Sequence, residues 1–112
     1  MAAITNFYID AGATFGAIIT VKGSDGVPLN LSDYTVASQI RKSYASLTAY
    51  NFNATVYSTG GGKIRLSLTP TQSAAIKPGR YLYDVEITAN GTGEKLRVSE
   101  GLVIITPQIT QI

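Results

Sequence analysis

Apolar and polar residues alternate along several short segments of this chain, and this alternation restricts its possible folds more than any other feature. In residues 63–68 (KIRLSL), every second residue is Ile or Leu, and Lys, Arg and Ser lie between them. Residues 34–42, 49–58 and 80–88 show the same period of two. Successive side chains of a strand point to opposite faces, so this period predicts sheets buried on one side. The expected inward-facing residues are Tyr34, Val36, Ser38, Ile40, Phe52, Ala54, Val56, Ile64, Leu66, Leu68, Tyr81, Tyr83, Val85 and Ile87.

Turn sequences separate these segments at intervals of about ten residues, the spacing typical of sandwiches. Asp25-Gly26, the TGGG of residues 59–62 and Asn90-Gly91 are the clearest of them. Asn90-Gly91 suits a hairpin of two residues, although a longer loop fits the spacing equally well. Residues 69–76 carry the one helical signal, because Thr69 suits an N-cap, Pro70 the first helical position and Gln72 a capping box. We therefore expect an all-β sandwich of seven or eight strands, with a short helical turn near residues 70–76.

The composition limits the chemistry available to the chain. It has no cysteine and no histidine, which excludes disulfides and thiol nucleophiles and removes the commonest metal ligand and general base. Its nine basic residues are scattered rather than gathered into a stripe, which argues against nucleic-acid binding. No apolar run approaches the ~20 residues of a membrane helix. The first residues, MAAITNFYIDAG, do not resemble a secretory signal. We expect a non-enzymatic protein without metal or cofactor, made in a cytoplasm.

Two acids in residues 80–88 (RYLYDVEIT) are the main candidates for chemistry. Asp84 and Glu86 are two residues apart, so on a strand their Cα atoms would lie about 6.6 Å apart on one face. This spacing is compatible with a small glycosidase. The alternation, however, places both acids on the outward face, and the next strand offers Lys95 and Arg97 at matching spacing. We therefore interpret the four residues as structural ion pairs across a hairpin.

Residues 43–51 (SYASLTAYN) form an uncharged segment between Lys42 and Lys63. It contains Tyr44, Leu47 and Tyr50, and tyrosine-rich uncharged segments are typical of protein contacts. An ordinary connecting loop explains the segment equally well. The three residues are thus candidates for a protein contact.

Three longer segments carry a resemblance to a known family: DAGATFGAIITVKGSDGVPLNLSDYTVASQIRK, then GGGKIRLSLTPTQSAAIKPGRYLYDVEI, then LRVSEGLVIITPQIT. In this order they resemble small structural proteins of tailed-bacteriophage virions, in particular the N-terminal domain of the baseplate upper protein family. The matching elements are residues 12–15, 26–32, 62–69, 78–86 and 100–110. The resemblance implies one immunoglobulin-like antiparallel β-sandwich over residues 1–112, with strand-like tails at both ends.

The same resemblance implies a part of a phage virion, made in the host bacterial cytoplasm. The partners of this chain would be other virion proteins, and the chain would assemble as a homo-oligomer or in many copies. It would belong to the baseplate, the tail, the neck or the decoration of the capsid. The alternative from another class is a carbohydrate-binding sandwich that aids attachment to the host surface. In that case Tyr8, Tyr44 and Tyr57 would stack on sugar rings, and Asn51 and Asn53 would bind hydroxyl groups.

Overall fold

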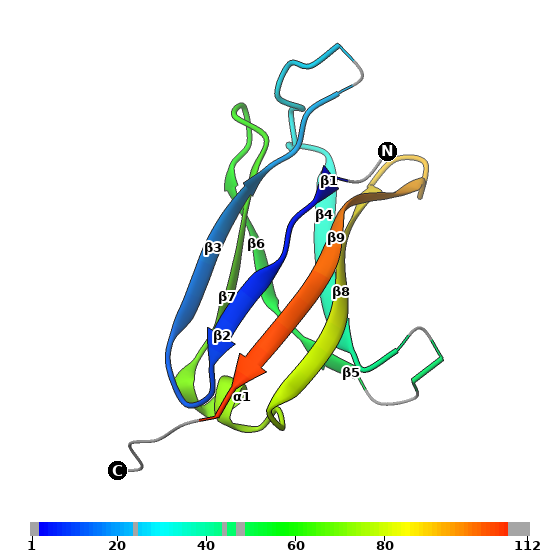
Figure 1. The fold of residues 1–112 in the computed structure, drawn as a ribbon. Coiled ribbons are helices and arrows are strands. Elements are labelled where there is room, and N and C mark those ends of the chain that lie inside the picture. Colours follow the sequence, from blue (N-terminus) through cyan, green and yellow to red (C-terminus); the bar gives the residue numbers. More distant parts are fainter. Residues whose placement is uncertain (1–2, 24, 44, 47–48, 108–112) are drawn as a thin grey trace.

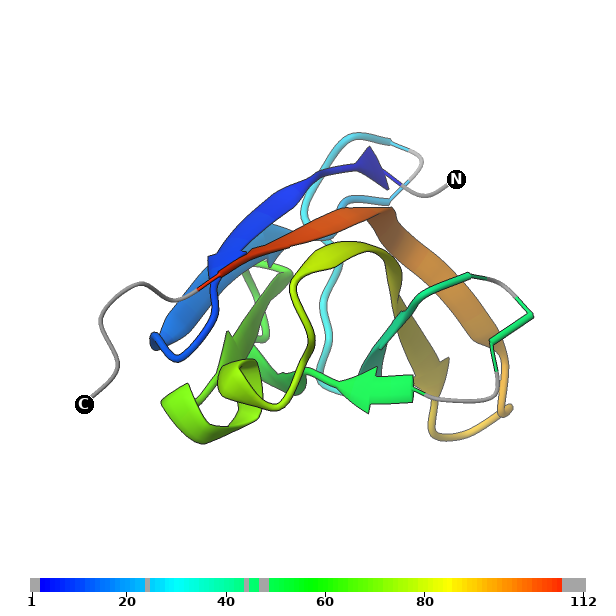
Figure 2. The same ribbon diagram turned by 60° about the horizontal axis from the view of Figure 1, so that its bottom comes forward.

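The computed structural model describes residues 3–23, 25–43, 45–46 and 49–107, which form two β-sheets packed face to face (Figure 1). A short helix, α1, closes one end of the sandwich (Figure 2). The elements in chain order are β1 (Ala3–Ile4), β2 (Phe7–Asp10), β3 (Phe15–Thr20), β4 (Tyr34–Arg41), β5 (Ala49–Asn51), β6 (Asn53–Ser58), β7 (Lys63–Leu68), α1 (Pro70–Ala74), β8 (Gly79–Ala89) and β9 (Lys95–Thr106).

The strand order is that of an immunoglobulin-like sandwich. The large sheet has the order β1-β9-β8-β4-β5, with β2 also paired to β9, and the small sheet has the order β3-β7-β6. Neighbours are antiparallel except β1 and β2, which both run parallel to β9. β1 and β2 follow one another along the same strand, and β5 continues into β6 as the chain crosses between sheets. Counted as continuous runs, the strands of the described residues number seven, which confirms the expected all-β sandwich.

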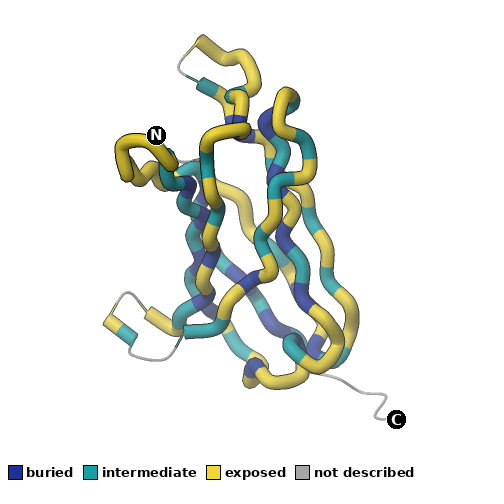
Figure 3. Tube along the Cα trace, turned by 180° about the vertical axis from the view of Figure 1, so that it is seen from behind, coloured by how far each residue is buried: buried dark blue, intermediate teal, exposed yellow. Residues whose placement is uncertain are grey.

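The core lies between the sheets and contains the residues that the alternation predicted. Ile64, Leu66, Val85 and Ile87 are fully buried, and Tyr81 and Tyr83 are nearly so. Tyr34, Val36, Ala54 and Val56 are only partly buried but pack against the same core. Buried and exposed residues accordingly alternate along the strands in Figure 3. The rings of Phe7, Phe15, Phe52 and Tyr83 pack together across both sheets, with centroids 5.0–6.3 Å apart.

The predicted capping box fixes the start of α1. The Gln72 N–H donates to the Thr69 hydroxyl, and the Thr69 N–H donates to the Gln72 side-chain oxygen at 2.9 Å. Farther along the helix, Ser73 is completely buried. Its Oγ accepts the Gly12 N–H at 3.0 Å and donates to the Ala13 carbonyl at 2.8 Å. This one side chain therefore ties α1 to the turn between β2 and β3.

Two buried tyrosines also join separate parts of the chain through their hydroxyl groups. Tyr81, near the start of β8, donates to the Lys77 carbonyl at 2.6 Å, as in the tyrosine corner of immunoglobulin-like domains. Tyr83 donates to the Thr5 carbonyl at 2.6 Å and so connects β8 with the N-terminal strand. Each of these core tyrosines thus fixes a distant or upstream stretch of backbone against β8.

The glycine-rich turn between β6 and β7 is packed closely against its surroundings. Gly62 has a φ of 64°, its carbonyl accepts the Val21 N–H at 2.7 Å, and its N–H donates to the Thr59 carbonyl at 3.3 Å. A Cβ at this position would come within 2.5 Å of the Val21 carbonyl oxygen. Only glycine fits there, for both its backbone conformation and its close approach.

Candidate functional site

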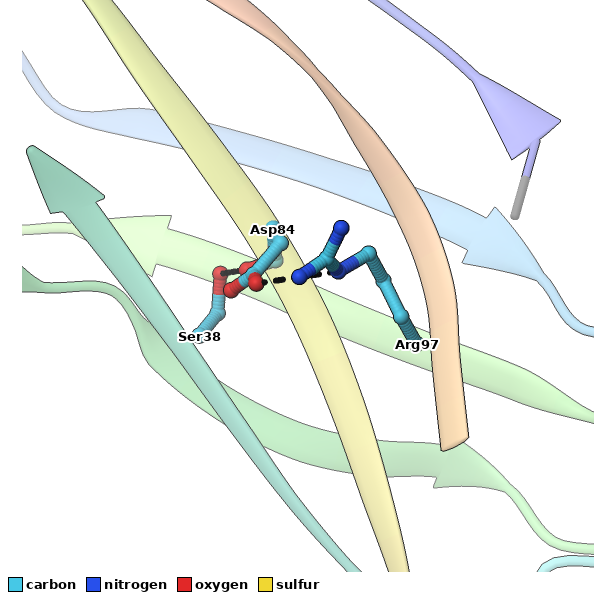
Figure 4. A network of polar contacts seen from close by, with 3 residues as sticks. All are labelled: Ser38, Asp84 and Arg97. Atoms are coloured by element: carbon cyan, nitrogen blue, oxygen red, sulfur yellow. Dashed lines mark hydrogen bonds and ion pairs between the residues drawn. The ribbon is translucent and has the colours of Figure 1, made fainter. Parts of the chain in front are cut away.

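The outward face of the large sheet holds the two acids singled out in the sequence. Asp84 lies on β8 with Gln39 of β4 on one side and Glu100 of β9 on the other. Its Oδ2 is 3.3 Å from the Arg97 Nε, and its backbone carbonyl accepts the Ser38 hydroxyl at 2.6 Å (Figure 4). The Asp84 side chain is 32% exposed and that of Arg97 47%, so the ion pair is half-buried.

The hairpin between β8 and β9 explains which predicted ion pairs form. A two-residue turn at Asn90-Gly91 would set Lys95 opposite Glu86. Instead the Ala89 N–H donates to the Glu94 carbonyl around a four-residue loop, and Lys95 lies opposite Thr88. Of the four residues interpreted as structural ion pairs, Asp84 and Arg97 form one. Lys95 and Glu86 form no ion pair within the described part of the chain, because Lys95 lies beyond the acids and Arg97, opposite Glu86, is paired with Asp84.

The environment of Asp84 shifts its ionisation. Burial raises the pKa of the Asp84 carboxyl above its ordinary value, and repulsion from Glu86 raises it further. The nearby Arg97 lowers this pKa, Glu100 raises it, and Arg41 lowers it. Glu86 and Glu100 thus lie close enough to repel the Asp84 carboxylate, and Arg97 and Arg41 oppose that repulsion.

These residues line a hollow of about 900 Å³ on the outward face, which extends around the free edge of β4. Arg41 is engaged within it, because its guanidinium donates to the Ser46 carbonyl and to the Gln39 side chain. Within the described ranges no group of three or more acidic residues has the arrangement of a metal site. The outward-facing residues that line the hollow are Ile4, Asn6, Ala37, Gln39, Arg41, Leu82, Asp84, Glu86, Arg97, Glu100 and Leu102.

Apolar side chains continue across this face, a feature that the alternation did not predict. Ile4 is 80% and Tyr8 74% exposed on the edge strand. Leu102 and Ile104 of β9 and Leu82 of β8 also point outward and are only half-buried. The signal was present in residues 102–105 (LVII), because an uninterrupted apolar run is typical of a strand that is covered on both faces.

Of the predicted contact residues in the loop after β4, Tyr44 and Leu47 lie outside the described residues. Tyr50 lies in β5 and is partly buried, with its ring edge-on to Tyr81 at a centroid distance of 6.3 Å. Part of Tyr50 therefore belongs to the core, and its role in a partner contact stays a prediction.

The residues proposed for sugar binding do not gather in one place. Tyr8 lies on β2 in the large sheet, and Tyr57 lies on β6 in the small sheet. Asn53 exchanges two side-chain hydrogen bonds with Gln72, which occupy its amide group. Asn51 lines the hollow of the large sheet. Tyr44 is outside the described residues.

No helix among the described residues is long and apolar enough to cross a membrane. No protein-family model and no curated protein sequence matches the chain. The N-terminal domain of ORF48 from phage TP901-1 has a similar structure, with a TM-score of 0.57 and 9% identity over 92% of this chain and 84% of that domain. This likeness shows the fold alone.

Two further solved structures are less similar. InlP of Listeria monocytogenes gives a TM-score of 0.48 at 16% identity over 94% of this chain, which spans only 28% of the InlP chain. The Lin-41 filamin domain gives a TM-score of 0.41 at 14% identity over 81% of each chain.

Proposed function

We propose that this chain is a non-enzymatic structural component of a tailed-phage virion, made in the host bacterial cytoplasm, that acts through contacts with other virion proteins. The observation that carries the proposal is the likeness to a phage protein domain, which extends over nearly the whole of both chains. This likeness agrees with the order of sequence motifs by which the chain resembles structural proteins of phage virions. The fold likeness alone would suit many functions, so the surface chemistry supplies the second argument.

The surface suits protein contacts better than catalysis. The Asp84 carboxylate is held by Arg97, so it is not free to act with Glu86 as the pair of carboxylates that glycosidases use. The exposed side chains of Ile4 and Tyr8 instead extend an apolar surface along the sheet edge. Exposed apolar side chains that gather on one face are typical of an interaction surface.

The edge strand of the large sheet offers a second means of contact. Residues of the predicted strand-like N-terminal tail form β1 and β2, which pair with β9 of the same chain. They lie at the end of the strand order, so the outer backbone of β1 and β2 is open to a further strand. A neighbouring virion protein that adds a strand there would bind through main-chain hydrogen bonds.

Loading onto phage particles tests the proposal. The purified chain is mixed with virions and with particles that lack it, and the bound fraction is measured by sedimentation and light scattering. Saturable loading onto the deficient particles is the expected result. Absence of loading, together with selective binding on a glycan array, would contradict the proposal and favour the carbohydrate-binding alternative.

Catalysis is tested separately with Asp84→Asn. We expect neither the wild-type chain nor this variant to hydrolyse a panel of glycosides. Turnover by the wild-type chain that disappears in Asp84→Asn would refute the non-enzymatic part of the proposal.

A further inference from the structure

The outward face of the large sheet is chemically unlike a face that water alone covers. Leu82 and Leu102 lie directly opposite each other on β8 and β9, and Tyr8 lies opposite Ile104. One row farther along, Ile4 lies opposite Glu100 at the rim of the hollow. The face therefore has an apolar half, bordered by Arg80 opposite Ile104, that adjoins an acidic half around Asp84, Glu86 and Glu100.

The acidic half carries three acids, Asp84, Glu86 and Glu100, beside Arg41 and Arg97, which leaves one negative charge in excess. Arg97 is paired with Asp84, and Arg41 is directed to the loop after β4. Glu86 lies opposite Arg97 in the strand register, but neither Glu86 nor Glu100 forms an ion pair among the described residues. Cations supplied by another molecule would relieve the repulsion that both acids exert on Asp84, and apolar side chains beside those cations would cover the leucines.

The outward face of the small sheet has the complementary composition. None of the residues of β3, β6 and β7 is acidic, and β7 carries Lys63 and Arg65 on the outward side. Arg65 lies directly opposite Ile18, which is 49% exposed. Tyr57, at 59% exposure, lies near Lys63 on the neighbouring strand.

From this complementarity we infer that the outward face of the small sheet in one copy docks on the outward face of the large sheet in a second copy of this chain. Arg65 and Lys63 would meet Glu86 and Glu100, and Ile18 would meet the leucines of β8 and β9. The two faces differ, so the contact is head-to-tail and repeats from copy to copy. Such a contact builds a ring or a filament rather than a closed dimer.

This inference deepens the proposed function, because it names one partner of the virion component as the chain itself. It is also separable from that function. A chain that self-associates but does not load on particles would support the docking and contradict the virion role. A chain that loads on particles as isolated copies would support the virion role and contradict the docking.

Two charge reversals, Arg65→Glu and Glu100→Lys, test the contact by light scattering and sedimentation over a concentration series. We expect the wild-type chain to associate in a salt-sensitive manner and each variant to associate at least about tenfold more weakly, the change that about 1.4 kcal/mol produces. Lys77→Glu and Glu94→Lys are the matched controls, because they change the net charge equally but lie in loops, outside the strands that form the two faces.

Mixing the two variants gives the decisive result. The acid introduced by Arg65→Glu in one copy can then face the cation introduced by Glu100→Lys in the next. The unaltered faces of the two variants also match, so an alternating assembly is expected to form. Recovery in the mixture, but in neither variant alone, supports the head-to-tail contact.

Four results would overturn the inferred contact. The first is a wild-type chain that stays monomeric at all concentrations, and the second is a pair of variants that associate like the wild type. The third is loss of association in only one variant, and the fourth is a mixture that does not recover association.

Discussion

Ser73→Ala removes one oxygen atom from the point where α1 meets the turn between β2 and β3. The Ser73 side chain is inaccessible to solvent, and its Oγ accepts the Gly12 N–H while donating to the Ala13 carbonyl. Alanine leaves the shape of the site almost unchanged. The substitution therefore isolates the effect of these hydrogen bonds on the free energy of unfolding.

The burial of Gly12 and Ala13, the two hydrogen-bond partners of Ser73, determines how much stability the substitution removes. A buried N–H that loses its partner costs about 1–3 kcal/mol. Gly12 is only half-buried and Ala13 is exposed, so water partly replaces the lost contacts. Alanine also favours the helix over serine by about 0.5 kcal/mol. We expect a net loss of about 1–2 kcal/mol, which lowers the melting temperature of a chain of this size by about 4–8 °C.

Urea denaturation and thermal unfolding measure the loss, with Ser67→Ala as the matched control. Ser67 lies on β7 and makes no side-chain hydrogen bond among the described residues, so its removal is expected to change stability little. Hydrogen exchange at the Gly12 amide reports the local effect and is expected to accelerate in Ser73→Ala. Equal stability of the two variants, with unchanged exchange at Gly12, would refute the assigned role of Ser73.

Three other substitutions test separate features. Tyr81→Phe removes the bond to the carbonyl four residues upstream and is expected to cost about 1 kcal/mol in urea denaturation. Tyr34→Phe is the matched control and is expected to cost less, because the Tyr34 hydroxyl has no hydrogen-bond partner in the described segments. Gly62→Ala is expected to lower the free energy of unfolding by more than the roughly 1–2 kcal/mol that a left-handed backbone costs, because the added Cβ also meets the Val21 carbonyl oxygen. Gly60→Ala is the control, because a Cβ there meets nothing within 4 Å. Because the folded state raises the pKa of Asp84, it holds that proton more tightly than the unfolded state does. The stability of the wild type relative to Asp84→Asn should therefore be greatest below the ordinary pKa of 3.8 and fall as pH rises through the raised value; a difference that grows with pH would contradict this sign.

Along the alternating segments, the sequence was sufficient to predict which side chains face the core, because the facing side follows directly from a period of two. Ile64, Leu66, Val85 and Ile87 all face the core as predicted. The capping box at Thr69 was also predictable, since it depends on residues only three positions apart. Local chemistry and alternation thus determine the strands and the helix.

Contacts between distant segments could not be predicted in the same way. No local pattern indicates that Ser73 would bond Gly12, sixty-one residues away, or that Tyr83 would bond Thr5. The tight packing of Gly62 likewise depends on where residues 21 and 29 lie in the fold. The outward apolar patch was overlooked for a different reason, because an apolar run fits a fully buried strand as well as an exposed one.

The loop between β8 and β9 determines the charge of the outward face. With a two-residue turn, Lys95 would neutralise Glu86 and Arg97 would neutralise Asp84, and the face would have satisfied its own charges. The four-residue loop moves Lys95 beyond the acids, and the bulge after Val85 sets Glu100 beside Asp84. The hollow is therefore lined by three acids and only two arginines, next to the half-buried Leu82 and Leu102. Because ion pairs within one chain would have removed the attraction for a partner's cations, this register is what makes the large sheet suitable for docking.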